Sequence, residues 1–309
     1  MKLFCGSSNV PLAEDIAKEL GISLSASKIT RFSNSETKVQ ILEDVRDEVC
    51  VVIQTTSSPT DTHLMELFLF CDALRRQEAK KVIGVIPFFG YARQDMQHFE
   101  GESVSAHMVI RFLETVGFSK IYTLDLHNEA TSAVFSIPFK NMTAMRELAK
   151  ATKAHFTKKN ISLDEVSLLI PDQGGIEQGR FFGEELYGST DFPMAVIEKQ
   201  RTGETVQSFG IHGEIKGKHV VVVDDMIVTG GTIISAVESL KKEYTIETLT
   251  VVATHHDFVK DAVQKLEESI IDTVIASNSI LLDPNLKMPK LHEVSLAPLI
   301  ADELRHLIQ

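Results

Sequence analysis

The sequence predicts an α/β protein built from mainly parallel sheets flanked by helices. Short apolar runs alternate with stretches whose apolar residues recur at helical spacing, which is typical of strands joined by crossover helices. One run, Val220–Val223, consists of four consecutive valines. An uninterrupted apolar strand indicates burial on both faces, as in a parallel sheet that helices cover.

The first half of the chain contains three expected strands and two expected helices. The strands are expected at Val49–Ile53, Val82–Pro87 and Ile121–Leu126. Apolar residues recur at i, i+3, i+4 and i+7 in Leu64–Cys71 and in Val109–Val116, which is the spacing of one helix face. Gly117 follows the second stretch and can end that helix in a left-handed conformation.

The second half repeats this pattern. A helix face is expected at Ile233, Ala236, Val237 and Leu240, and strands are expected at Leu168–Ile170, Met194–Ile197, Val220–Val223, Leu249–Ala253 and Val274–Ala276. At roughly 100–200 residues per domain, the 309-residue chain is long enough for two domains. Because the halves are similar in length and pattern, we expect a duplicated domain with its boundary near Pro138–Met145.

Composition narrows the classes of partner. The chain has 43 acidic and 31 basic residues and a net charge of −12, which argues against a general nucleic-acid or anionic-membrane binder. A phosphorylated small molecule is not excluded, because a metal ion and a few local cations can outweigh the global charge. The three cysteines form no CxxC or zinc-ligand spacing and are interpreted as reduced core residues. Apolar runs are short, so we expect a cytoplasmic protein that binds neither membrane nor nucleic acid.

The strongest indication of chemistry is the segment Val220–Thr232, VVVVDDMIVTGGT. A buried strand ends in Asp224 and Asp225, and a turn of small residues, Thr229–Thr232, then enters a helix. Ligands of open α/β sheets bind at the carboxyl ends of strands, and a glycine turn before a helix directs backbone N–H groups at a phosphate. The alternative is a tight turn whose acids only cap the helix. It is disfavoured, because two ionised groups at the end of a valine strand are costly to desolvate.

Three further segments place polar residues after expected strands, and each has an ordinary structural interpretation. Asp125 and His127 are two residues apart, so on a strand they would share a face, either as a ligand site or as a hydrogen-bonded pair. Asp172-Gln173-Gly174-Gly175 is either a second phosphate turn or a common turn with a solvated acid. Lys199 and Arg201 precede a glycine-containing segment, 202–213, which we expect to be mobile, and two cations there are usually solvated.

Taken together, these segments resemble ribose-phosphate diphosphokinases (phosphoribosyl-pyrophosphate synthetases). Segment 220–232 is similar to the phosphoribosyl-diphosphate loop of the type I phosphoribosyltransferase fold. The remaining motifs occur in the family's order along nearly the whole chain: Phe32-Ser33-Asn34-Ser35-Glu36, His63-Leu64-Met65-Glu66-Leu67, Gly90-Tyr91-Ala92-Arg93-Gln94-Asp95, Leu124-Asp125-Leu126-His127, Pro171-Asp172-Gln173-Gly174-Gly175 and Leu296-Ala297-Pro298-Leu299.

The resemblance implies a fold and a reaction. It implies two similar domains of the type I phosphoribosyltransferase fold, residues 1–142 and 143–294, with a C-terminal helix, about 295–309, that returns to the first. It also implies transfer of diphosphate from ATP to the anomeric hydroxyl of ribose 5-phosphate, with release of AMP. Mg²⁺ is the implied cofactor, because oxygen ligands and a triphosphate suit a hard cation. A homo-oligomer built from dimers is implied as well.

The resemblance also implies a role for each site residue. Lys199 and Arg201 would be catalytic, since phosphoryl transfer depends on preorganised cations. His127 and Asp172 would bind metal, with Asp125 in support. The ribose 5-phosphate site would comprise Asp224, Asp225, Val228, Thr229, Gly230, Gly231 and Thr232. ATP would be held by Phe32, whose ring would stack on adenine, and by Asn34, Ser35, Glu36, Arg93, Gln94 and Asp95. No GxxxxGK[ST] motif is present, so another device must hold ATP.

The chain departs from the family pattern at four places. Val228 stands where an acid is frequent, and Asn34 replaces a common Asp. Segment 96–102 lacks the basic residues of regulated members, and Asp44 replaces a hydroxyl near the inhibitory phosphate/ADP site, although Arg46 remains. We therefore expect an active enzyme with weak or absent phosphate activation and ADP inhibition by that route.

Two other functions are weighed against this one. The first is a catalytically weak or inactive regulatory homologue. The loss of the acid at Val228 and of the basic segment 96–102 favours it, and the retention of Lys199 and Arg201 opposes it. The second is a phosphoribosyltransferase acting on a base. It would need only one such domain, so the near-doubled length opposes it.

Overall fold

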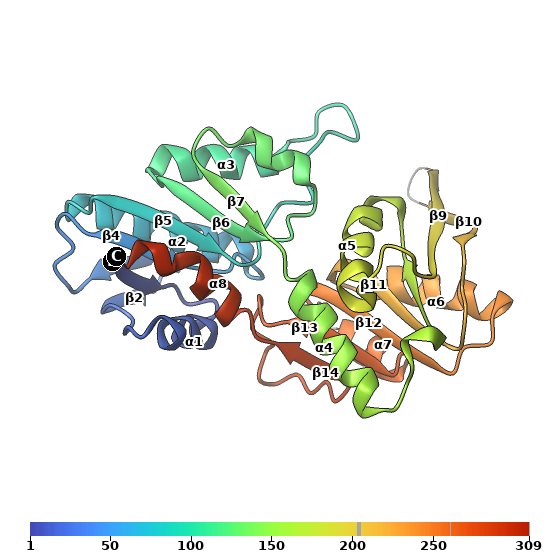
Figure 1. Cartoon of the computed structure of the whole chain (residues 1–309). Helices are drawn as coiled ribbons and strands as arrows, with labels where there is room; N and C mark the ends of the chain where they lie inside the picture. Colours follow the sequence, from blue (N-terminus) through green and yellow to red (C-terminus); the bar gives the residue numbers. More distant parts are fainter. Residues whose placement is uncertain (203–204, 260, 309) are drawn as a thin grey trace. The chain divides into compact units, whose positions relative to one another are not determined.

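The computed structural model describes residues 1–202, 205–259 and 261–308, and the chain forms two compact units (Figure 1). Unit 1 contains Met1–Thr143, Ser279–Leu281 and the segment from Ser295 onward, and unit 2 contains Ala144–Asn278 and Leu282–Val294. The side chains of Lys199, Gln200, Arg201 and Thr232 lie outside the described part.

Unit 1 has a five-stranded parallel sheet of order β1-β4-β5-β6-β7 and a separate antiparallel hairpin, β2–β3. Its elements are β1 Lys2–Cys5, α1 Val10–Leu20, β2 Ser27–Arg31, β3 Thr37–Ile41, β4 Val49–Ile53, α2 Thr60–Arg76, β5 Lys81–Ile86, α3 Ser105–Val116, β6 Lys120–Leu124, β7 Phe139–Met142 and α8 Ala297–Leu304. Helices α1 and α8 pack together, as do α2 and α3, and the two pairs cover opposite faces of the sheet (Figure 1).

Unit 2 has a seven-stranded sheet of order β10-β9-β8-β11-β12-β13-β14, parallel except for the β9–β10 pair. Its elements are α4 Met145–Lys158, β8 Val166–Ile170, α5 Ile176–Tyr187, β9 Met194–Thr202, β10 Thr205–Gly213, β11 His219–Ile227, α6 Gly231–Glu243, β12 Thr248–His256, α7 Ala262–Glu268, β13 Thr273–Ser277 and β14 Leu291–Val294. Helices α4 and α5 contact each other, and one core cluster joins α6 and α7 to the sheet.

The strands expected from apolar runs are confirmed. Val220–Val223 lies in the middle of β11, between β8 and β12, and all four valines are buried. Gly117 ends α3 with a φ of 111°, in the left-handed conformation that its position predicts. The sequence pattern therefore identifies the strands that helices cover on both faces.

The segment after Thr202, which we expect to be mobile, contains a strand that the apolar pattern did not indicate. Strand β10 pairs with β9 in an antiparallel hairpin, with a register shift between Ser208 and Gly210. Such a bulge interrupts the alternation of side chains. The apolar residues of β10 therefore do not follow the strict period of two that identifies a strand from sequence.

Candidate functional site

The candidate site of unit 2 lies at the carboxyl edge of its sheet, where β9, β8 and β11 are consecutive neighbours. The register pairs Ile170 of β8 with Val196 of β9, and Leu169 of β8 with Val222 of β11. Because the strands are parallel, the segments that follow them emerge at one edge. Topology thus brings the Asp172 turn, the acids of β11 and the backbone of Lys199 and Arg201 to the same side of unit 2.

Among the residues at this edge, Asp224 has the clearest shift in pKa. Burial raises its pKa well above the ordinary value, and the neighbouring carboxylates of Asp225 and Asp172 raise it further. One oxygen of Asp224 accepts a hydrogen bond from the backbone N–H of Asp225 at 2.9 Å, which favours the ionised form but does not outweigh the other effects. A donor-rich sugar, or a cation shared with phosphate oxygens, would relieve the repulsion that Asp225 and Asp172 exert on Asp224.

The turn between β11 and α6 has the geometry of a phosphate cradle. Gly230 caps the helix with a φ of 71°, and a Cβ atom there would approach Leu266 to 3.1 Å. Thr229 Oγ1 accepts a hydrogen bond from Gly231 N at 3.2 Å, and Val228 O accepts one from Val259 N at 3.1 Å. Glycine is needed here for conformation and space, and the turn leads into the positive end of the α6 dipole.

The Asp172 turn is the second loop at this edge. Asp172 is exposed, and one of its carboxylate oxygens accepts a hydrogen bond from Gly174 N at 3.0 Å. A short 3-10 helix, Gln173–Gly175, then leads into α5. The acid thus holds the turn in shape and keeps its remaining lone pairs accessible to a ligand.

In unit 1, the loops after β5 and β6 lie at the carboxyl edge of the sheet and are joined directly. Asp95 accepts a hydrogen bond from the side chain of Asn128 at 2.6 Å, which links the segment of Arg93 and Gln94 to the residue that follows His127. Gln94 accepts a hydrogen bond from Ser105 Oγ at 2.8 Å, at the start of α3. The exposed side chain of Arg93 lies on the same fixed loop.

One geometric argument from the sequence is wrong. Asp125 and His127 do not share a strand face, because β6 ends at Leu124 and Asp125 has a φ of 39°. Asp125 is buried, with only 8% of its surface exposed, whereas His127 is exposed. A left-handed residue breaks the alternation of a strand.

The hairpin β2–β3 presents the other residues expected to hold ATP. Its tip is a tight turn in which Phe32 N donates to Glu36 O at 2.9 Å, and Asn34 accepts a hydrogen bond from Glu36 N at 3.3 Å. Ser35 has a φ of 72°. The Phe32 ring is 55% exposed, so the tip displays an aromatic face to solvent.

Sequence reasoning missed the residues that hold this hairpin. Glu66 of α2 is 1% exposed and forms an ion pair with Arg31, which precedes the tip. The available indication was that Glu66 follows His63 by three residues and precedes Phe70 by four, and so lies on the buried face of α2. A charged residue on the apolar face of a helix is rarely buried without partners.

The thiols take no part in these sites. Burial raises the pKa of Cys5 and Cys71 to about 12 and that of Cys50 to about 11. All three are therefore neutral at physiological pH and poor nucleophiles, which agrees with the interpretation of the cysteines as small core residues.

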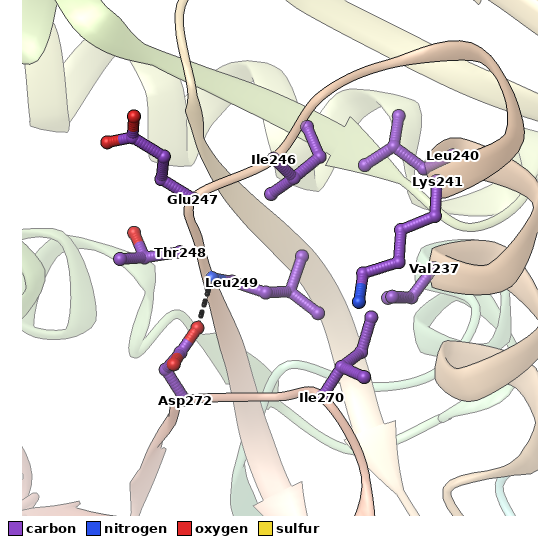
Figure 2. A pocket seen from close by; sticks show the side chains of 9 residues that line it. All are labelled: Val237, Leu240, Lys241, Ile246, Glu247, Thr248, Leu249, Ile270 and Asp272. Atoms are coloured by element: carbon purple, nitrogen blue, oxygen red, sulfur yellow. Dashed lines mark hydrogen bonds between the residues drawn. The ribbon is translucent and has the colours of Figure 1, made fainter.

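A separate cavity of about 80 Å³ lies between α6 and the beginnings of β12 and β13 (Figure 2). Lys241 and Ile270 line it, and Asp272 accepts a hydrogen bond from Leu249 N at 2.7 Å. Its lining residues are at the amino ends of the strands, opposite the edge that carries Asp172 and Asp224. The cavity is too small for a nucleotide and does not belong to the candidate site.

The structure defines an α/β protein with glycine-containing turns at the carboxyl edge of a mainly parallel sheet, and comparisons with known proteins identify its family. Residues 1–117 match the N-terminal domain of ribose phosphate pyrophosphokinase, and residues 191–309 match the phosphoribosyl synthetase-associated domain. The chain is 36% identical to ribose-phosphate pyrophosphokinase 2 of Enterococcus faecalis, over 99% of the chain and 93% of that protein. It is 33% identical to ribose-phosphate pyrophosphokinase of Fusobacterium nucleatum, over 98% of the chain and 94% of that protein.

A solved structure agrees with these relatives. Phosphoribosylpyrophosphate synthetase from Mycobacterium smegmatis superposes with a TM-score of 0.90 at 32% identity, and the match covers 99% of this chain and 98% of that one. The chain belongs to the ribose-phosphate pyrophosphokinase family. The α/β class and the family predicted from the motifs are thereby confirmed.

Proposed function

We propose that this chain transfers the terminal diphosphate of ATP to the anomeric hydroxyl of ribose 5-phosphate, giving phosphoribosyl diphosphate and AMP. The observation that carries the proposal is the edge of unit 2, where the turns after β8 and β11 and the end of β9 are neighbours. Two glycine-containing turns beside a strand whose backbone carries Lys199 and Arg201 suit the transfer of a diphosphate onto a phosphorylated sugar.

For ribose 5-phosphate, we propose the turn 228–232 together with Asp224 and Asp225. Backbone N–H groups at the start of α6 would hold the 5-phosphate, and the helix dipole favours the negative charge. The carboxylates would accept hydrogen bonds from sugar hydroxyls, which replaces repulsion between acids with hydrogen bonds. Val228 contributes its backbone alone, since its side chain is apolar.

For ATP, we propose the tip of the β2–β3 hairpin and the loop of Arg93, Gln94 and Asp95. Exposed Phe32 supplies a flat apolar surface for a base. Asn34, Ser35 and Glu36 offer polar atoms beside it. Arg93 supplies a permanently charged, forked donor for phosphate oxygens.

A divalent cation fits the carboxylates of unit 2, and we propose Mg²⁺. Asp172 and Asp224 offer hard oxygen ligands, and the raised pKa of Asp224 reflects a repulsion that a cation would offset. Within the described ranges, no three His, Cys, Asp or Glu side chains could hold a metal by themselves. Mg²⁺ is usually bound by one or two carboxylates plus substrate phosphates, so it does not require a set of three protein ligands. From the family resemblance, we also propose His127 as a metal ligand. When bound, the ion would neutralise charge on the triphosphate.

Lys199 and Arg201 are proposed to stabilise the transferring group. As the bond to the α-phosphate breaks and the bond to the sugar oxygen forms, negative charge shifts onto the bridging and equatorial oxygens. Preorganised cations carried by β9 would stabilise that charge without reorganisation.

Domain organisation, assembly and location complete the proposal. We propose that residues 1–142 with about 295–309, and residues 143–294, are two phosphoribosyltransferase-like domains. We also propose a cytoplasmic homo-oligomer built from dimers. Exposed Met65, Met108 and Phe112 on α2 and α3 support self-association. In the part of the chain that the structure describes, no helix is long and apolar enough to cross a membrane.

The test is AMP formation from ATP and ribose 5-phosphate with Mg²⁺, for the unaltered chain, Lys199→Ala and the matched control Lys241→Ala. Lys241 is an exposed lysine of unit 2. It lines the small cavity at the amino ends of the strands, away from the edge that carries Asp172 and Asp224 (Figure 2). Removing one transition-state donor lowers the rate by about 10²–10³-fold, so Lys199→Ala should be slow and Lys241→Ala normal. No AMP from the unaltered chain, or equal rates in all three, would reject the proposal, and a requirement for a nucleobase would indicate a base phosphoribosyltransferase.

A further inference from the structure

Glu66 is a buried carboxylate that accepts several hydrogen bonds within unit 1. It is 1% exposed and accepts hydrogen bonds from Ser7 Oγ at 2.6 Å, from Ser7 N at 3.2 Å and from Gln54 Nε2 at 3.0 Å. All these contacts are to one oxygen, Oε2. The other oxygen, Oε1, contacts Arg31 Nη2 at 3.4 Å.

The surroundings of Glu66 fix its position closely. Gln54, at the end of β4, accepts hydrogen bonds from Ser8 Oγ at 2.7 Å and from Ser8 N at 3.2 Å, and it donates to His63 O at 3.2 Å. Gly6 lies against this amide, and a Cβ atom there would stand 2.1 Å from Gln54 Oε1. A carboxylate held by fixed donors in a buried site is a rigid anchor, because moving it would leave several polar groups unsatisfied.

Arg31 connects that anchor to the tip of the β2–β3 hairpin. Its Nη2 faces Glu66, while its Nη1 donates to the carbonyl oxygen of Ser35 at 3.2 Å. The Arg31 side chain is 43% exposed, so it bridges a buried acid and a surface turn. A planar fork suits this task, since its two donors are fixed relative to each other.

We propose that Glu66 and Arg31 are positioning residues that hold the hairpin tip in the conformation that receives the nucleotide base. This rests on the proposed role of Phe32, Asn34, Ser35 and Glu36 in binding ATP. The ion pair touches neither reacting atom. It acts by keeping the Phe32 ring and the turn that follows it in one arrangement.

The expected change in the KM for ATP depends on the fraction of molecules whose hairpin tip is in the conformation that binds ATP. In the part of the chain that the structure describes, the hairpin forms a two-stranded sheet of its own and does not join the five-stranded sheet. Without the Arg31 bridge, its tip is restrained by its own turn and by the packing of β3 on α2. The apparent affinity of a ligand falls in proportion to the competent fraction. A competent fraction of about a tenth would raise the apparent KM for ATP roughly tenfold.

The experiment compares Arg31→Gln, Glu66→Gln and the double variant with the control Lys38→Gln. Lys38 is an exposed cation of the same hairpin, opposite Thr30 in the strand register. The KM values for ATP and for ribose 5-phosphate, kcat and the Tm are measured for each. Arg31→Gln should raise the KM for ATP about tenfold, while the KM for ribose 5-phosphate and kcat change less than about twofold. The double variant should have a KM for ATP no higher than that of the poorer single variant, because both substitutions break the same ion pair.

Arg31→Lys supplies the rescue, because it keeps the charge and loses the fork, and it should recover part of the ATP affinity. Arg31 is partly exposed, so its variants keep the proposal testable if Glu66→Gln does not fold. The inference would be overturned if Arg31→Gln had the same KM for ATP as Lys38→Gln. It would also be overturned if Arg31→Gln raised the KM values for both substrates equally and lowered the Tm. If the unaltered chain forms no AMP, the proposed function fails. Equilibrium dialysis of labelled ATP then decides the inference: weaker binding by Arg31→Gln supports it, and unchanged or absent binding overturns it.

Discussion

Asp224→Asn should stabilise the ligand-free protein while it reduces activity. The side chain stands at the end of β11 beside Asp225 and Asp172, where burial and the two acids raise its pKa. Asparagine has the same shape and keeps an oxygen that can accept the bond from Asp225 N. The substitution therefore removes a repelling charge without opening a cavity or leaving that N–H unsatisfied.

The magnitude follows from the linkage between pKa and stability. Each unit by which folding raises the pKa corresponds to about 1.4 kcal/mol of stability lost on ionisation. Since burial and two neighbouring acids act together, we expect a gain at pH 7.5 of the size that removal of an unfavourable charge commonly gives, on the order of 1 kcal/mol. For a unit of this size, that gain raises the Tm by roughly 3 °C.

The raised pKa of Asp224 determines how the stability gain of Asp224→Asn changes with pH. A carboxyl whose folded pKa is raised is protonated in both states below its ordinary value of 3.8, so there its charge has no effect on stability. The penalty appears as the pH rises above that value and is complete above the folded pKa. The advantage of Asp224→Asn should therefore grow as the pH rises from 3.8 through the folded pKa, and it should shrink on acidification.

The assay is thermal and urea unfolding of the metal-free protein in chelator between pH 4.5 and pH 8, with Asp191→Asn as control. Asp191 is an exposed acid of unit 2 on the loop before β9, and its amide variant should change the free energy of unfolding by less than about 0.5 kcal/mol. AMP formation is measured on the same samples. A destabilised Asp224→Asn protein, or a gain that grows as the pH falls, would refute the electrostatic reasoning.

Two further predictions concern unit 1. Gly6→Ala should lower the free energy of unfolding by about 3 kcal/mol, because a Cβ would stand 2.1 Å from Gln54 Oε1. Gly21→Ala, with a φ of 69° and open space around it, should lower it by only about 1 kcal/mol, and equal losses in urea titrations would contradict the packing argument. Inhibition by ADP should be hyperbolic and competitive with ATP, because Arg46 already pairs with Glu78 at 2.9 Å beside Asp44. Sigmoidal ADP inhibition that inorganic phosphate relieves would contradict this expectation.

The sheets could be predicted from sequence where burial on both faces leaves an unbroken apolar run, as at Val220–Val223. Strands without such a run were missed. Edge strands β7 and β14 are short and only half-buried, and the register shift in β10 breaks its alternation. The spacing of apolar residues indicates which side chains are buried, so it does not identify strands that are partly exposed to solvent.

The chemistry could be predicted only in part. Residues that follow buried strands, such as Asp172 and Asp224, were found because the sheet sends them to one edge. The shared face of Asp125 and His127 was wrong, because a positive φ at Asp125 is not visible as a pattern. Glu66 was missed as an anchor because its partners, Ser7, Gln54 and Arg31, are remote in sequence and only the fold brings them together.

The most direct test follows the label from ATP carrying ³²P in its β-phosphate, with ribose 5-phosphate and Mg²⁺. If the diphosphate moves as one unit, all the label that leaves ATP appears in phosphoribosyl diphosphate, and unlabelled AMP forms in equal amount. Labelled ADP together with a ribose bisphosphate would show transfer of a single phosphate and would contradict the account.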